Sequence, residues 1–254
     1  MGPAPRPANS KGAVLYQSLS GAAYVLRRID TVDVQLPNGS TQTSTLTRIG
    51  YLSVSATGPA PMQVSIVLDS LTVDGPVQFA VAADSARGTR WTGMLAADGH
   101  LSGMTANRVS AAGEQMQSML SMFFPVIPAG GARAGATWAD TTSDSIRADA
   151  FVVQERAIAT SLARGPAAHN GGQGIAIETL ASFTRSGVGT PFGQPADLQS
   201  TGRRQITSWL GTDGVFMGSE GSETSDMTLN IHAMGQSIPI KQRSTFSITP
   251  VAGR

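Results

Sequence analysis

The residues that most often perform chemistry in proteins are few in this chain. It has three histidines, His100, His169 and His232, and no cysteine. No two histidines have the close spacing typical of metal ligands, and the sequence has no G-x-S-x-G, H-E-x-x-H, Walker or G-x-G-x-x-G motif. The absence of cysteine excludes disulfides, thiolate metal sites and cysteine nucleophiles. We therefore predict that the chain is not an enzyme, and we predict neither a metal centre nor a cofactor.

Two acidic segments are the strongest candidates for an oxygen-rich cation site. Asp140–Asp144 and Glu220–Asp226 each place carboxylates and hydroxyls close together in the sequence. Neither has the Asp-x-Asp-x-Asp-Gly spacing of a calcium-binding loop, so we interpret both as solvated turns. Asp69 and Asp74 flank a short apolar segment, and we interpret them as marking the ends of a strand.

Large apolar residues supply the only candidate ligand site. Methionines and phenylalanines that recur through one segment would provide a deformable lining for an apolar molecule. Two tryptophans lie near equivalent places in two similar hairpins and could line the same cavity. The candidate ligand-binding residues are Met116, Met119, Met122, Phe123, Phe124, Trp91 and Trp209. The same residue types also serve as core anchors, because large aromatic side chains dominate burial.

The elements that would position these residues are mainly strands. In Met62–Leu68, for example, apolar side chains alternate with other residues, as in a half-buried strand. Between such segments, Asp98-Gly99 and Asp213-Gly214 predict tight hairpins with type I′ turns. Within 107–123, apolar residues recur three and four positions apart, which indicates one face of a helix. Phe124-Pro125 ends that helix, because proline disfavours a helical conformation in the preceding residue.

We therefore predict a mainly β fold, with antiparallel curved sheets or half-barrels in two related halves around one central amphipathic helix. The halves are 12–128 and 129–254, and they form one compact unit. Arg90–Leu101 is similar to Gln205–Phe216, since each is a strand, an Asp-Gly pair and a return strand. Internal duplication and the general similarity of hairpins both explain this pattern. Ser186–Thr201 is rich in glycine and proline, which predicts an exposed loop.

One linker resembles a known signature. Phe123-Phe124-Pro125-Val126-Ile127-Pro128, followed by Gly135-Ala136-Thr137-Trp138, resembles the F-P-x-x-P … G-x-x-W pattern of uncharacterised secreted or lipoprotein-like bacterial β proteins. The resemblance implies a LolA-like half-barrel in the cell envelope. The signature includes no catalytic or binding residues, so none is transferred to this chain. A proline-rich linker followed by a core tryptophan explains the same residues.

Composition indicates an extracytoplasmic protein, in the periplasm or outer cell envelope. Charged residues make up 14% of the chain, against about 25% in an average protein. The net charge is +1 and no basic run exceeds two residues, so we predict no nucleic-acid partner. No apolar run approaches the roughly 20 residues of a transmembrane helix. Residues 1–11 are rich in proline and alanine and predict a disordered leader, either the remnant of a removed export signal or an ordinary frayed terminus.

Two functional hypotheses follow from these observations. In the first, a non-catalytic envelope protein binds a lipid or another apolar small molecule in a β cleft. In the alternative, the chain is a structural or accessory subunit that contacts an envelope protein partner through β-sheet edges or surfaces. An enclosed apolar cavity would favour the first hypothesis, whereas a flat apolar patch or a long unpaired edge would favour the second.

Overall fold

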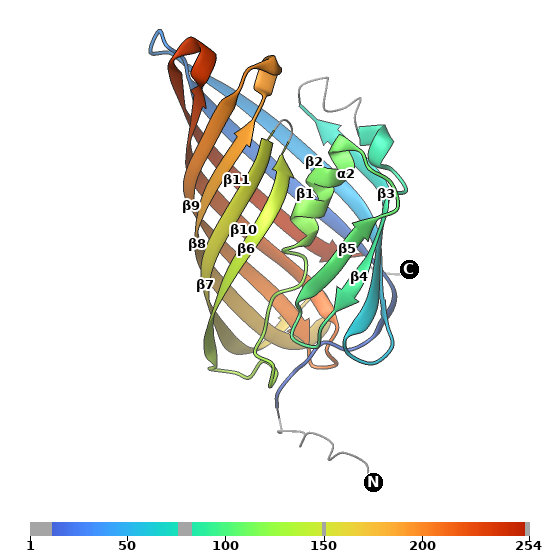
Figure 1. Ribbon diagram of the computed structural model, residues 1–254. Coiled ribbons are helices and arrows are strands. Elements are labelled where there is room, and N and C mark those ends of the chain that lie inside the picture. Colours follow the sequence, from blue (N-terminus) through green and yellow to red (C-terminus); the bar gives the residue numbers. More distant parts are fainter. Residues whose placement is uncertain (1–11, 76–82, 149–150, 252–254) are drawn as a thin grey trace, which may run out of the picture.

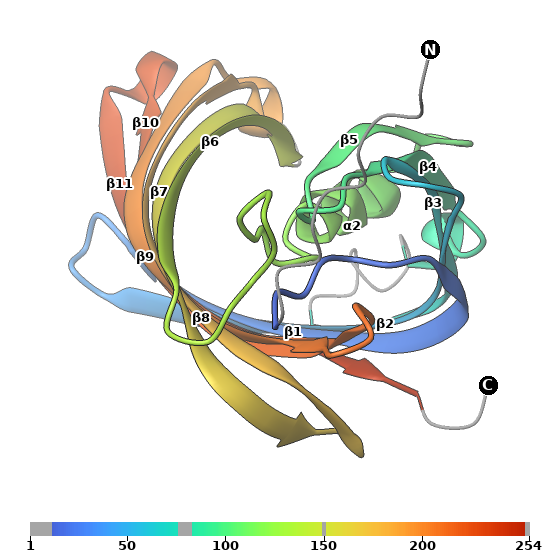
Figure 2. The same ribbon diagram turned by 90° about the horizontal axis from the view of Figure 1, so that it is seen from below.

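The protein is built around one large, strongly curved antiparallel sheet. Its computed structural model describes residues 12–75, 83–148 and 151–251. The predicted disordered leader, residues 1–11, lies outside these described residues. The sheet has 11 strands and wraps around a helix and the loop that follows it (Figures 1 and 2). The prediction of a mainly β, antiparallel, half-barrel-like fold is therefore confirmed.

The two predicted halves are joined in a single continuous sheet. The strands are β1 (Leu19–Gln35), β2 (Thr41–Thr57), β3 (Met62–Asp74), β4 (Arg90–Leu95), β5 (Leu101–Ala106), β6 (Thr137–Ala148), β7 (Phe151–His169), β8 (Gly172–Gly189), β9 (Ala196–Gly211), β10 (Phe216–Ile231) and β11 (Gln236–Pro250). Their order is β5-β4-β3-β2-β1-β11-β10-β9-β8-β7-β6. Consecutive strands are therefore neighbours within β1–β5 and within β6–β11, whereas β5 and β6 form the two edges, and β1 joins the halves by pairing with β11. Short 3-10 turns, η1 (Pro191–Gly193) and η2 (His232–Met234), complete the second half.

The central helix, α2 (Ala111–Leu120), is shorter than the predicted range 107–123. Asn107 does not join the helix because its backbone N–H donates to the carbonyl of Arg90, which extends the β4–β5 pairing. Ser110 caps the helix, and its hydroxyl accepts a hydrogen bond from the backbone N–H of Gly113 at 3.1 Å. Val109 therefore precedes the helix and is 82% exposed, although the apolar spacing had placed it on the buried face.

The Asp-Gly hairpins form, but not with type I′ turns. Gly99 N–H donates to the Ala96 carbonyl, and Ala96 N–H donates to the His100 carbonyl. Gly214 makes the same pattern in its own hairpin, and the two glycines have φ angles of 92° and 80°. These bonds define three-residue loops, in which only the last position needs a left-handed glycine. The turn positions were predicted correctly, whereas the turn type was wrong.

One N-terminal segment holds these two hairpins at the same end of the sheet. Tyr16 N–H donates to the Ala97 carbonyl at 3.1 Å, in the β4–β5 turn. The next residue, Gln17, donates its N–H to the Gly214 carbonyl at 3.2 Å, in the β9–β10 turn. The similar hairpins are therefore linked by a common partner at the base of the curved sheet.

An aromatic cluster fills this base. Phe123 contacts Tyr24 and Phe216 with ring centroids 5.2 Å apart in each case, and it contacts Phe124 at 4.9 Å. Tyr16 packs edge-on against Phe124 at 5.5 Å. Because such edge-to-face contacts add to the free energy gained by burial, the cluster closes the lower end of the half-barrel with a packed core.

Three segments predicted as loops or turns are strands instead. β8 and β9 occupy most of Ser186–Thr201, and only residues 190–195 connect them. Glu220–Asp226 lies in the middle of β10, and Asp140–Asp144 lies within β6. Each of these segments pairs with a neighbouring strand, so cross-strand hydrogen bonds outweigh their low intrinsic preference for the β conformation.

The two acidic residues predicted to mark strand ends differ from each other. Asp74 is the last residue of β3, as predicted. Asp69 lies inside the same strand and accepts a hydrogen bond from the Ser53 hydroxyl at 2.6 Å, so its predicted position at a strand end was wrong. Among the described residues, no helix has the length and apolar character needed to cross a membrane.

Candidate functional site

A cavity exists because the two halves carry side chains of different size on their inner faces. In the first half, Leu52, Ile66 and Trp91 are fully buried and form one core with Met116 and Leu120 of α2. The helix therefore packs against the inner face of β1–β5. Facing it across the half-barrel, part of the inner wall of the second half is made of small residues, which leave space beside the helix. The cavity-lining small residues are Ala157, Ala159, Ser161, Thr179, Ala181 and Ser208.

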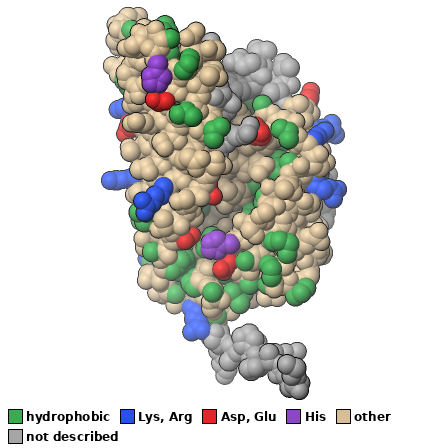
Figure 3. Space-filling view, viewed as in Figure 1, with side chains coloured by type: hydrophobic (Ala, Val, Ile, Leu, Met, Phe, Trp, Pro, Cys, Tyr) green, Lys and Arg blue, Asp and Glu red, His purple; other side chains and the backbone are tan. Residues whose placement is uncertain are grey.

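The space left between α2 and this wall is a cavity of about 410 Å³. That volume lies within the roughly 300–1,000 Å³ typical of small-molecule pockets. Met119, Met122, Phe124 and Trp138 line its apolar part. The space-filling view shows the molecule hollowed between β6 and the side that carries α2 and β5 (Figure 3).

The structure brings together three of the predicted ligand-binding residues. Met119, Met122 and Phe124 line the cavity. Met116, Phe123 and Trp91 do not; each is completely buried in the hydrophobic core. For these three residues, the core interpretation of the pattern is correct.

Trp209 does not line the cavity either. Its ring is stacked on His169, with the centroids 3.6 Å apart and the planes within 3°. Its neighbours in β9, Ser208 and Leu210, are buried on the inner face, so the alternation of the strand turns Trp209 outward. The sequence indicates that the two tryptophans face opposite sides of the sheet. Trp91 lies seven residues before Asp98, an odd spacing, whereas Trp209 lies four before Asp213, an even one.

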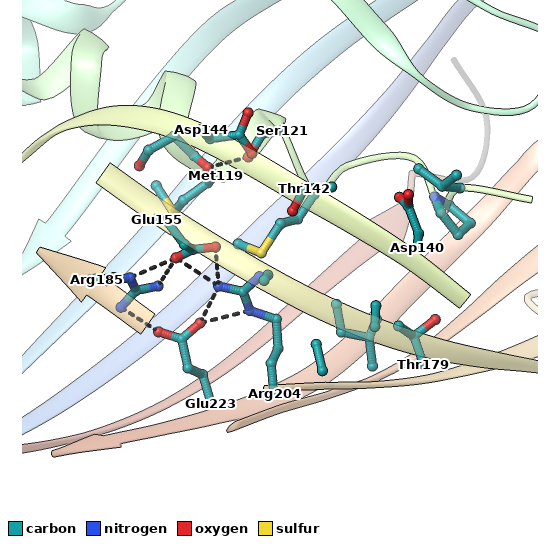
Figure 4. Close-up of a pocket in the computed structure, with 18 of the residues that line it drawn as sticks. Met119, Ser121, Asp140, Thr142, Asp144, Glu155, Thr179, Arg185, Arg204 and Glu223 are labelled. Carbon is teal, nitrogen blue, oxygen red and sulfur yellow. Dashed lines mark hydrogen bonds and ion pairs between the residues drawn. The ribbon is translucent and has the colours of Figure 1, made fainter. Parts of the chain in front are cut away.

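A buried quartet of charges forms part of the cavity wall. Glu155, Arg185, Arg204 and Glu223 come from four adjacent strands, β7 to β10 (Figure 4). Arg204 Nη2 lies 2.7 Å from Glu223 Oε2, and Arg185 lies 2.6 Å from Glu155 and 3.0 Å from Glu223. The Phe183 ring supports both guanidinium groups, with its centroid 4.2 Å from Arg185 and 5.2 Å from Arg204.

A second charged group continues this wall across β1 and β2. Asp30 lies 2.8 Å from Arg28 Nε and 2.6 Å from Arg48 Nη1. It also accepts hydrogen bonds from the Ser244 hydroxyl and the Gln242 amide of β11. Asp30 and Ser244 are cross-strand partners, as are Ser244 and Glu223, and Glu223 and Arg204. We call the seven ionised residues Arg28, Asp30, Arg48, Glu155, Arg185, Arg204 and Glu223 the charged belt; all of them line the cavity.

The belt keeps the carboxylates of Asp30 and Glu223 ionised despite their burial. Burial alone would raise the pKa of Glu223, but Arg204 and Arg185 outweigh that effect and lower it below the ordinary value. Burial likewise opposes ionisation of Asp30, yet Arg28, the Ser244 hydroxyl and Arg48 lower its pKa. Conversely, Glu223 and Glu155 raise the pKa of Arg185 against the effect of burial. Asp30, Arg185 and Glu223 are therefore stabilised in their charged forms by neighbouring residues of the belt.

Sequence reasoning missed the belt. Glu223 was assigned to a solvated turn, whereas the structure places it 98% buried on the inner face of β10. The available signal is the alternation in Ser219, Gly221, Glu223 and Ser225, which share one face of the strand. That alternation predicts the face but not the partners, because Arg204 and Glu155 come from other strands.

A slit connects the cavity region with the outside. The edge strands β5 and β6 stand at opposite ends of the strand order, and α2 lies between them. A second hollow of about 510 Å³ lies along this gap, lined by residues 99–104 and by β6. It shares Ser118, Ser121, Thr142 and Asp144 with the lining of the first cavity. The two spaces are therefore adjacent, and the slit offers a route between them.

His100 stands at the rim of this slit. Its Nδ1 lies 3.1 Å from Asp98 and its Nε2 lies 3.9 Å from Asp140 of β6. His169 and His232 lie away from the cavity, in contact with Trp209 and Asp197. In the part of the chain that the structure describes, no three histidine or acidic side chains are grouped so that they could hold a metal ion.

Comparison with known proteins does not assign this site. No protein-family model matches the chain, and no curated protein matches it. The resemblance of the Phe123–Trp138 linker to secreted bacterial β proteins stays a prediction. The geometry of the cavity is therefore what supports a function.

Proposed function

We propose that this protein is a non-catalytic binding protein that holds a lipid or another apolar small molecule in the cavity between α2 and the inner wall of β7–β9. The observation that carries the proposal is the cavity itself. The helix α2 packs against the first half of the sheet, and small residues form part of the wall opposite it. A space of about 410 Å³ that a ligand can fill remains between them.

The chemistry of the lining supports binding rather than catalysis. The ionised residues of the belt are paired with one another, with no histidine beside them among the residues that line the cavity. The apolar part includes Met119 and Met122, whose flexible side chains adapt to ligands of different shape. The low share of charged residues in the chain supports our further proposal that the protein acts outside the cytoplasm, in the bacterial envelope.

The alternative function, an accessory subunit that pairs through a sheet edge, has less support. β6 does present an edge of 12 residues, and within the described part of the chain β7 is the one strand that pairs with it. This edge carries Asp140 and Asp144, and α2 packs beside it. Charged residues and a covering helix are devices that prevent edge-to-edge association.

A cavity-filling substitution tests the binding proposal. Ala159 lines the cavity, so Ala159→Phe places a ring in the ligand space. The neutral apolar dye Nile red is the probe, and native mass spectrometry of gently purified protein detects any ligand that is retained. We expect the unsubstituted protein to bind Nile red and the Ala159→Phe variant to bind it at least about 10-fold more weakly, a loss of about 1.4 kcal/mol.

The matched control is Ile158→Phe, since Ile158 is the preceding residue of β7 and is 55% exposed on the outer face. This variant should bind the dye like the unsubstituted protein. Absence of dye binding to the unsubstituted protein, together with a clean apo mass, would contradict the proposed function. Equal loss of binding in both variants would show that the dye does not report on the cavity.

A further inference from the structure

The charged belt has more positive than negative groups. Four guanidinium groups, those of Arg28, Arg48, Arg185 and Arg204, face three carboxylates, those of Asp30, Glu155 and Glu223. These groups are between 2% and 17% exposed, so water screens them weakly. An uncompensated charge in such surroundings is costly, and a cavity wall of this kind favours a counter-charge on whatever fills the cavity.

Two of the guanidinium groups each have one nitrogen atom that contacts none of the other described residues through a hydrogen bond or ion pair. Arg28 uses Nε for Asp30 and Nη2 for Ser244. Arg204 uses Nε and Nη2 for Glu223 and Glu155. Among contacts within the described residues, Nη1 of Arg28 and Nη1 of Arg204 take part in no hydrogen bond or ion pair.

These two arginines act on the same part of the wall. Arg28 donates to the Ser244 hydroxyl at 3.0 Å, Ser244 lies opposite Glu223 in the sheet, and Arg204 forms an ion pair with Glu223 at 2.7 Å. Arg204 is 91% buried, and its side chain lines the cavity. The two arginines that carry the unused N–H donors therefore lie near the same carboxylate, in a wall that borders the cavity.

Asp140 and Asp144 do not supply the missing negative charge. Both line the cavity from the edge strand β6, so the lining as a whole includes five carboxylates. No ion pair among the described residues joins Asp144 to an arginine of the belt, whereas Asp30, Glu155 and Glu223 each lie 2.6–2.8 Å from one; burial and the neighbouring Glu155 also raise the pKa of the Asp144 carboxyl. The side chain of Asp140 is 30% exposed beside His100, where solvent screens its charge.

We infer that the ligand is an amphiphile with a single acidic head group, which lies against Arg28 and Arg204 while its apolar body fills the space lined by Met119, Met122 and Phe124. This inference rests on the proposed binding function and specifies its ligand class. The acid can be a carboxylate or a phosphate monoester, since both present oxygen atoms that guanidinium groups bind.

A head-group series on one chain length tests the inference. Isothermal titration calorimetry would compare dodecanoate, dodecyl phosphate, dodecanol and dodecylamine at constant ionic strength, with acetate as the head group alone. We expect at least one of the two acids to bind at least about 10-fold more tightly than dodecanol, because a hydrogen bond between two charged groups is stronger than one to a neutral hydroxyl. Acetate should show no measurable binding, and the amine should bind more weakly than the alcohol.

A charge-neutralising variant assigns the effect to the belt. Arg28→Gln removes the excess positive charge, and Asp30 still keeps Arg48, Ser244 and Gln242 as partners. The Arg28→Gln variant should bind the preferred acid about 10-fold more weakly and bind dodecanol as the unsubstituted protein does. The matched control is Arg27→Gln, because Arg27 is the adjacent residue of β1 and is exposed on the outer face. This control should bind all ligands normally, although it loses the same charge.

The outcomes separate the inference from the proposed function. Dodecanol that binds as tightly as both acids, or dodecylamine that binds more tightly, would overturn the inference and leave the cavity as an apolar site. Acetate that binds as tightly as dodecanoate would also overturn it, since the apolar body would contribute nothing. If no member of the series binds, the proposed function fails and the inference fails with it.

Discussion

Neutralising Glu223 should remove a large part of the stability of the fold. The Glu223 side chain is 2% exposed and lies 2.7 Å from Arg204 and 3.0 Å from Arg185. In Glu223→Gln the two arginines share Glu155 alone, and the net charge of the belt rises from +1 to +2. Breaking a buried ion pair from one side costs about 3–5 kcal/mol. Against a typical total of about 5–15 kcal/mol, a loss of this size would shift the unfolding midpoint strongly.

Urea unfolding, with linear extrapolation to water, measures this loss. The matched control is Glu220→Gln, because Glu220 lies in the same strand but is exposed on the outer face; its free energy of unfolding should change by no more than about 0.5 kcal/mol. The double variant Glu223→Gln/Arg204→Gln restores the belt charge to +1, so its loss should be smaller than the sum of the single losses by about 1–3 kcal/mol. Equal stability of Glu223→Gln and Glu220→Gln would refute the argument that the belt is a buried, mutually dependent set of charges.

Two further predictions concern acid and the base of the sheet. Because the folded state lowers the pKa values of Asp30 and Glu223, their contribution is fully present above the ordinary carboxyl range near pH ~4 and is lost as the pH falls through the lowered values; urea midpoints measured from neutral to acid pH should therefore decrease, and less steeply in Glu223→Gln. A decrease of equal steepness in both proteins would contradict the assignment to Glu223. Gly99 has a φ angle of 92°, and a Cβ atom there would collide with the Pro125 carbonyl and the Tyr16 ring, so Gly99→Ala should lose more stability than Gly39→Ala. Gly39 has a φ angle of 81° with open space around it, and its substitution should cost about 1–2 kcal/mol for the left-handed backbone alone; equal midpoints for the two variants would show that the N-terminal segment does not hold this turn tightly.

Local pattern determined most of the secondary structure. Alternation in segments such as Met62–Leu68 predicted strands, and the spacing of Met116, Met119 and Leu120 predicted the helix and its buried face. These predictions succeed because the periods of 2 and 3.6 residues follow from backbone geometry alone. They fail at the margins, as at Val109 and in Ser186–Thr201, where capping and pairing with distant strands override local preference.

Tertiary structure alone decided the cavity, the slit and the charged belt. The sequence shows that Ala159 and Ala181 are small, but they leave a cavity only because α2 packs against the opposite half of the sheet. It also shows that Glu155 and Glu223 are acidic, but their partners are 19 to 49 residues away in the chain. Strand order and register place these side chains within hydrogen-bonding distance, because residues on neighbouring strands become close only when the sheet has formed. The charged belt and its partners on β11 come from seven adjacent strands and therefore leave no compact motif in the sequence.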